Sequence, residues 1–215
     1  MMLSRQRDLV RTAALSLLTL GLTGCISLLP KEKAAQLYRF GADATTTTSA
    51  PSPSSPGGER FTVRAASLGF ERAASTDRIL TVSGDQVAYI AAARWVSAAS
   101  SLFESAESRA FDTQAAKSRL LAPGEPTAGD YVLKVEVRSF EARYDHGASG
   151  APTIVVEVYA ALADRKDPRL GGARLFQAVE PADSNAVHAI AGAFDKAVAA
   201  VLKDLVAWVD AKGVP

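Results

Sequence analysis

The sequence predicts an α+β protein: a single domain with a mixed or antiparallel sheet and two main helices packed on it, the longer one C-terminal. Three observations support this fold class. Apolar and polar residues alternate over residues 131–137, 154–162 and 173–179, and turn-rich stretches separate them, as in an antiparallel meander. Residues 92–110 and 184–212 instead repeat apolar residues every three or four positions, which is typical of helices with one buried face.

Shorter strands come before these elements. Residues 36–40 and 61–66 each alternate apolar with polar side chains over a short run, which favours half-buried strands. Residues 79–82 and 86–90 form another pair of apolar runs, and Ser83-Gly84-Asp85 separates them. This arrangement predicts a hairpin.

Local details refine the longer elements. Phe140 falls out of phase with the strand that begins at Tyr131, so we expect a β-bulge near Ser139. In the last helix, Asp183 or Ser184 is the expected N-terminal cap and Gly213 the end. The first helix has the stripe Ala92, Val96, Ala99, Phe103, Ala106 and Ala110, widened by Trp95 and Leu102; the last has Ile190, Phe194, Val198, Val201, Leu205 and Val209.

The start of the chain has the layout of a bacterial secretory signal. Three arginines among residues 1–11 precede the apolar run 13–22, which is too short to span a bilayer. The small residue Gly24 and the chain's only cysteine, Cys25, follow directly, and together with Leu22 and Thr23 they resemble the lipobox of lipoproteins. We therefore expect cleavage between Gly24 and Cys25. The modified Cys25 would carry a diacylglyceryl group and an N-acyl chain, which together make a lasting membrane anchor.

These features divide the chain into parts. Residues 1–24 are the predicted signal peptide, 25–34 a lipidated tether, and 35–215 the single α+β domain. Within that domain, residues 42–59 consist almost entirely of Ala, Thr, Ser, Pro and Gly. Such a composition buries too little apolar surface to offset its ordering entropy, so a flexible loop is expected there.

The composition excludes several classes of function. Cleavage would remove three of the 24 basic residues and one of the 23 acidic ones, leaving 21 and 22. A chain so nearly neutral offers no electrostatic footprint for nucleic acid. Six consecutive turn-forming residues, 145–150, include Asp, His and Ser but cannot hold the geometry of a catalytic triad. His188 has no partner ligand at metal-binding spacing. We therefore expect no enzyme activity and no cofactor or metal beyond the acyl groups on Cys25.

Four motifs follow one another along the chain: Tyr38-Arg39-Phe40, Tyr89 followed by Arg94-Trp95, residues 131–137 with Phe140-Glu141, and Ala193-Phe194-Asp195 through Leu205 and Trp208. Their order resembles the ABC-type transport auxiliary lipoprotein family, whose best-known members accompany MCE (mammalian cell entry) proteins in Gram-negative bacteria. Two departures are the long insertion at residues 42–59 and the absence of a proline in the helix after Trp95.

This resemblance implies an accessory lipoprotein of an intermembrane lipid transport system. It would sit on the periplasmic face of the outer membrane, which Ile26 after Cys25 also favours by likeness to known sorting signals. Its partner would be an MCE-domain protein and, through it, an inner-membrane ABC permease and ATPase; it could also assemble with copies of itself. The alternative is a lipid carrier with its own apolar pocket.

Four side chains are candidate partner-interface residues or packing anchors: Tyr89, Arg94, Trp95 and Trp208. Both tryptophans are expected on helix faces that pack on the sheet, and core packing is favoured over an interface role. Arg94 could cap an element, pair with a nearby carboxylate or face a partner, and the sequence does not choose among these roles.

Overall fold

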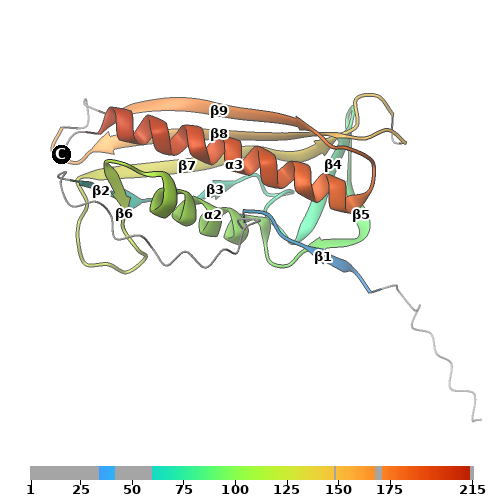
Figure 1. Ribbon diagram of the computed structural model, residues 1–215, viewed down its shortest axis with the longest axis horizontal. Helices are drawn as coiled ribbons and strands as arrows, with labels where there is room; N and C mark the ends of the chain where they lie inside the picture. The colour runs from blue at the N-terminus through green and yellow to red at the C-terminus, as the bar shows by residue number, and fades with distance from the viewer. Residues whose placement is uncertain (1–33, 42–59, 148, 168–170, 214–215) are drawn as a thin grey trace, which may run out of the picture. The chain divides into compact units, whose positions relative to one another are not determined.

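The computed structural model describes residues 34–41, 60–147, 149–167 and 171–213. Residues 35–215 form one compact unit. Its described part is a mixed nine-stranded sheet with two helices, of which the C-terminal one is longer (Figure 1). The predicted fold class is confirmed.

The antiparallel meander forms as predicted, from β7 (Tyr131–Arg143), β8 (Thr153–Asp164) and β9 (Gly172–Pro181). The register of β7 against β8 shifts between Val137 and Ser139, which confirms the predicted bulge. The extra residue returns Phe140 to the face that Val137 occupies, so both side chains are buried.

The other edge of β7 pairs with three short parallel strands, one after another along its length. They are β2 (Phe61–Ala65), β3 (Gly69–Phe70) and β4 (Arg78–Ser83). Outside them, β6 (Ser118–Leu120) pairs with β2, and the predicted hairpin adds β5 (Gln86–Trp95) to β4. The first strand, β1 (Gln36–Tyr38), pairs in parallel with the end of β5.

The prediction that a helix begins near residue 92 is wrong. Strand β5 continues to Trp95, and helix α2 spans Ala99–Gln114. Residues 93–95 pair with β1, which lies more than fifty positions earlier in the chain, so their backbone hydrogen bonds belong to a sheet that local periodicity does not reveal. The later part of the predicted stripe is confirmed, because Phe103 and Ala110 are buried.

Helix α3 (Val187–Lys212) has the predicted buried stripe, but its start differs. Ala186 occupies the N-cap position without a side-chain hydrogen bond, so the expected cap by Asp183 or Ser184 is wrong. Gly213 ends the helix as predicted, and its N–H donates to the Val209 carbonyl. A glycine is required there by close approach, because a Cβ would lie 2.2 Å from the ring of Phe61.

Both helices cover one face of the sheet (Figure 1), and aromatic rings fill the space between them and the strands. Phe140 on β7 is central: its ring centroid lies 4.7 Å from that of Phe194 on α3 and 5.1 Å from that of Phe40. Trp95 packs edge-on against Phe40 at 5.0 Å. Aromatic pairs at these separations contribute beyond their area burial, so this cluster joins β5, β7, α3 and the segment after β1.

Candidate functional site

The four side chains chosen from the sequence do not form one site. Trp95 lies on a strand, not on a helix face, and is 2% exposed. Its ring centroid lies 5.3 Å from that of Phe194. Trp208 does lie on α3 and packs 5.8 Å from Phe176 of β9, with 7% of it exposed. Both tryptophans are therefore packing anchors.

Tyr89 and Arg94 serve the local structure of β5. The Tyr89 hydroxyl donates to the Ala73 carbonyl at 3.1 Å, and the guanidinium of Arg78 lies 3.7 Å from the centre of its ring. Arg94 pairs with Asp77 at 3.0 Å, so of the roles that the sequence left open the structure shows pairing with a nearby carboxylate. A role of Arg94 at a partner interface stays a prediction. About half of each side chain in this ion pair is exposed, so it adds little stability.

Cys25 and Gly24 lie outside the described residues. Lipid attachment at Cys25 and cleavage after Gly24 therefore remain predictions. The described chain begins at residue 34, the last residue of the predicted tether, and enters the fold through β1.

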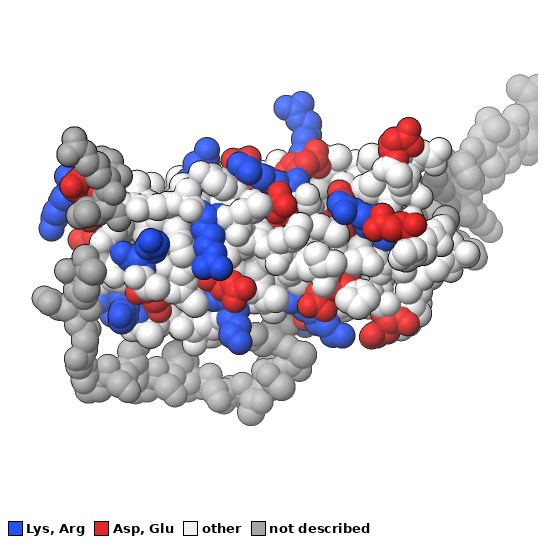
Figure 2. Space-filling view, turned by 90° about the horizontal axis from the view of Figure 1, so that it is seen from above, with Lys and Arg blue, Asp and Glu red and all other residues white. Residues whose placement is uncertain are grey.

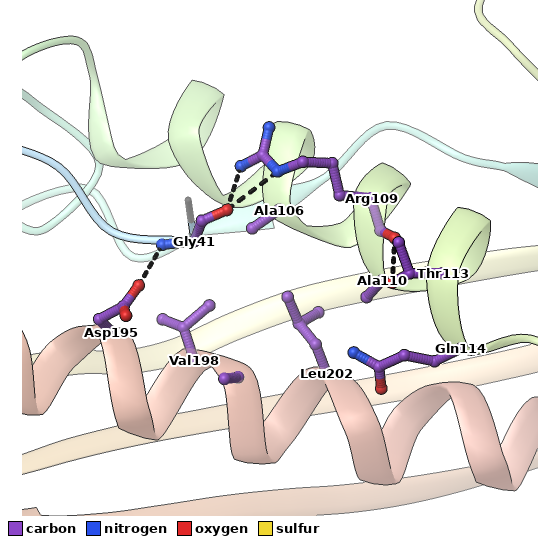
Figure 3. Close-up of a pocket in the computed structure, with 10 residues that line it drawn as sticks. Gly41, Ala106, Arg109, Ala110, Thr113, Gln114, Asp195, Val198 and Leu202 are labelled. Atoms are coloured by element: carbon purple, nitrogen blue, oxygen red, sulfur yellow. Dashed lines mark hydrogen bonds between the residues drawn. The ribbon is translucent and has the colours of Figure 1, made fainter. Parts of the chain in front are cut away.

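This entering segment meets both helices at a polar junction around Gly41. The N–H of Gly41 donates to Asp195 Oδ1 of α3 at 2.6 Å, and Arg109 Nε of α2 donates to the Gly41 carbonyl at 2.9 Å (Figure 3). Phe40, the preceding residue, is 1% exposed within the aromatic cluster. Gly41 thus forms hydrogen bonds with both α2 and α3, while Phe40 is buried between these helices and the sheet.

Only glycine fits this junction without strain. Gly41 has a φ of +67°, and a Cβ there would lie 2.5 Å from the Cβ of Ala106. The space around the junction is a pocket of about 140 Å³, lined also by Val198 and Leu202. That volume falls below the roughly 300–1,000 Å³ of ligand pockets, so we interpret the junction as a clamp on the segment that follows the predicted tether.

Sequence reasoning missed this clamp. Asp195 was part of a recognised motif, but no local signal connected it with a glycine 154 positions earlier. It also missed Glu107, a buried carboxyl on α2 that lines a pocket with the segments after β2 and β6. Glu107 follows Phe103 by four positions, so the interruption of an apolar stripe by a charged residue was a usable signal.

The sheet leaves large apolar side chains exposed at its outer strands. Strand β9 pairs only with β8 among the described strands, and Leu175 and Val179 on it are 49% and 54% exposed. They alternate with Phe176 and Ala178, which are buried, so they lie on the face away from the helices. Figure 2 shows acidic and basic residues interspersed on the visible surface without a large area of one sign.

Other classes of site find no support in the described part of the chain. No group of three His, Cys, Asp or Glu residues there could hold a metal ion. None of the helices in the described ranges is long and apolar enough to cross a membrane.

Comparison with known families identifies the chain. A family model described as "ABC-type transport auxiliary lipoprotein component" matches residues 41–206. The chain belongs to this family. The match begins at the clamp residue Gly41 and runs through most of α3, and it confirms the resemblance inferred from the motifs. No curated relative matches the chain.

Solved structures show the same fold. Protein XCC0632 from Xanthomonas campestris, described by the family model DUF330, is 25% identical, with a TM-score of 0.67 over 83% of this chain and 97% of that one. An uncharacterized protein at 11% identity has a TM-score of 0.62 over 82% of this chain and 99% of that one. The hypothetical protein CT253 from Chlamydia trachomatis, at 13% identity, has a TM-score of 0.50 over 71% and 97%. The last two show likeness of fold alone.

Proposed function

We propose that this family member is a non-enzymatic docking subunit of an MCE-type intermembrane lipid transport system. Lipid on Cys25 anchors it to the periplasmic face of the outer membrane, and the α+β domain binds an MCE-domain protein, which connects to an inner-membrane ABC permease and ATPase. The observation that carries the proposal is the match of residues 41–206 to the transport auxiliary lipoprotein family. The lipobox-like sequence ending at Cys25 supports the anchor.

The clamp at Gly41 fits a docking role. Between Cys25 and the first described strand lie ten residues, which span at most about 35 Å when fully extended. Because Asp195 and Arg109 hold Gly41 against both helices, the tether ends at a fixed point of the domain. A docking subunit needs such a defined attachment, since its partner-binding surface must stay within reach of the membrane.

The packed interior favours docking over the alternative of a lipid carrier. The space between sheet and helices is occupied by the aromatic cluster around Phe140. The pocket of about 590 Å³ beside α3 is lined by exposed residues such as Ala199, Ala200 and Lys203, so it is a surface groove. A carrier would need an apolar cavity that shields acyl chains from water, whereas the pocket of about 420 Å³ beside α2 is lined by Arg64, Glu104 and Glu107 as well as by apolar residues.

Affinity capture from membranes tests the docking role. The full-length protein should co-purify with an MCE-domain protein and its ABC ATPase. A Cys25→Ser variant should not, because without the thiol no acyl anchor forms and the domain is no longer held at the membrane. Capture that recovers neither partner would contradict the proposal.

Site-specific photo-crosslinking sharpens the test. A crosslinker at Leu175 or Val179, the exposed aliphatic residues of β9, probes the uncovered sheet face, and one at Lys203 on the solvent side of α3 is the matched control. Mass analysis of the protein without its covalent acyl groups distinguishes docking from the alternative of a lipid carrier. Stoichiometric non-covalent phospholipid would favour the carrier, and its absence together with a crosslink to the MCE-domain protein would favour docking.

A further inference from the structure

A second pocket, away from the clamp, has an unusual lining. It measures about 420 Å³ and lies between α2, the segment after β2 and the segment after β6. Leu68, Leu120 and Leu121 provide apolar walls, and Glu104 and Glu107 contribute two carboxyl groups from one helix. Residues three apart on a helix share a face, so both carboxyls belong to the same side of the pocket.

No cationic side chain among the described residues pairs with Glu107. The residue is 5% exposed, and its Oε1 is buried without a hydrogen-bond partner among the described residues. A buried carboxylate oxygen that lacks a partner is costly, and native structures rarely retain one without a role. Burial first, and the negative charge of Glu104 second, raise the pKa of Glu107 to about 7.

The other charged side chain of the pocket does not relieve this cost. Arg64, on β2, lines the pocket with Glu104 and Glu107, but its guanidinium donates to the carbonyl of Glu125 at 2.7 Å and to that of Thr127. The donors of Arg64 are therefore directed to the loop before β7. An ionised Glu107 would need a cation that the described residues do not supply.

We propose that this pocket binds a small organic cation: a primary ammonium on an aliphatic body. The ammonium donates hydrogen bonds to the Glu107 carboxylate, with Glu104 adding attraction from the rim, and the aliphatic part packs on the three leucines. The volume lies in the range of about 300–1,000 Å³ typical of small-molecule sites. The site is independent of the docking function and is testable apart from it.

The test uses hexylamine, hexanol and hexanoate as probes of equal chain length. Each is titrated into isotope-labelled full-length protein, and amide shifts of Leu68, Leu120 and Leu121 are followed by NMR. Hexylamine should bind on the order of tenfold more tightly than hexanol, because a charge-assisted hydrogen bond contributes more than a neutral one. Hexanoate should bind most weakly, since two carboxyls repel it.

Matched variants identify the group responsible. Glu107→Gln keeps the size of the side chain and removes its charge, so affinity for hexylamine should fall on the order of tenfold, whereas Glu180→Gln on β9 should leave it unchanged. Affinity in the wild type should rise between about pH 6 and pH 8, as Glu107 ionises while the amine stays protonated, and Glu107→Gln should lose this rise. Equal binding of hexanol, unaltered binding by Glu107→Gln, or no saturable shift at these leucines would overturn the proposal.

Discussion

The two edges of β7 are built in different ways. One edge pairs along its whole length with β8, and the closest pair, Arg143 and Thr153, is ten positions apart. The other edge is assembled from three short strands, and the paired residues Val63 and Tyr131 are 68 positions apart. The first edge forms from local contacts, whereas the second needs long loops to close before any contact is gained.

Side chains compensate for the short strands of the second edge. Asp130 accepts hydrogen bonds from the Thr62 N–H at 2.8 Å and the Thr62 hydroxyl at 2.7 Å, and these bonds hold its pKa below the ordinary value. Asp210 on α3 accepts from the Ser118 N–H and hydroxyl at 2.8 and 2.6 Å. The long-range edge therefore depends on specific residues, while the meander depends mainly on its alternating pattern.

The largest expected effect on the free energy of unfolding is at Phe194 of α3, which connects the long-range side of the sheet with β7. Phe194 is fully buried and packs on Trp95 of the long-range side and on Phe140 of β7. Phe194→Ala should lower the free energy of unfolding by about 3–5 kcal/mol, through lost burial and a residual cavity. Chemical denaturation of the purified protein measures this. Lys203→Ala, at an exposed position of the same helix, should change it by less than about 0.5 kcal/mol, and a near-silent Phe194→Ala would mean that α3 does not hold the two edges together.

Glu107 on α2 should make the free energy of unfolding depend on pH. Its folded-state pKa of about 7 lies above the ordinary value of 4.5, so its contribution to stability is fully present below about pH 4.5 and is lost as the pH rises through 7. Glu107→Gln should therefore gain up to about 3 kcal/mol relative to the wild type between about pH 4 and pH 8. Urea denaturation of both proteins across this range measures the difference. A constant difference would show that Glu107 does not titrate in this window.

Two glycine variants compare the clamp at Gly41 with a simple turn at Gly84. Gly41 and Gly84 have similar φ values of +67° and +59°, but only at Gly41 would a Cβ meet another atom, that of Ala106 at 2.5 Å. Gly84→Ala should cost about 1 kcal/mol, the strain of the left-handed conformation alone. Gly41→Ala should cost about 2–3 kcal/mol, because overpacking adds to that strain. Equal losses in thermal or chemical unfolding would argue that α2 can move aside and that the clamp is loose.

The smallest expected effect concerns the surface of β5. Arg94→Ala removes an exposed ion pair with Asp77 and should change the free energy of unfolding by less than about 0.5 kcal/mol. Denaturation and membrane capture should be measured on the same variant. Retained stability with lost capture of the MCE-domain protein would assign Arg94 to the partner interface, and normal capture would leave it a local structural residue.

Local patterns in the sequence were sufficient to predict part of the fold. The alternation of apolar and polar residues predicted β7, β8, β9 and the bulge before Phe140. It did so because each strand buries one face and the next strand follows after a short turn. The 3.6-residue period placed the buried stripe of α3 for the same reason. The order of motifs was also sufficient to identify the family.

The tertiary structure was needed to show which distant segments meet. It extended β5 through Trp95, because pairing with β1 outweighed a helical pattern in the same residues. It brought Gly41 to Asp195 and Arg109, and it left the Glu107 carboxyl buried without a partner among the described residues. The strand pairing of β5 with β1 and the hydrogen bonds at Gly41 join residues more than fifty positions apart, and the residues on each side carry no local sign of the partner that the fold will supply.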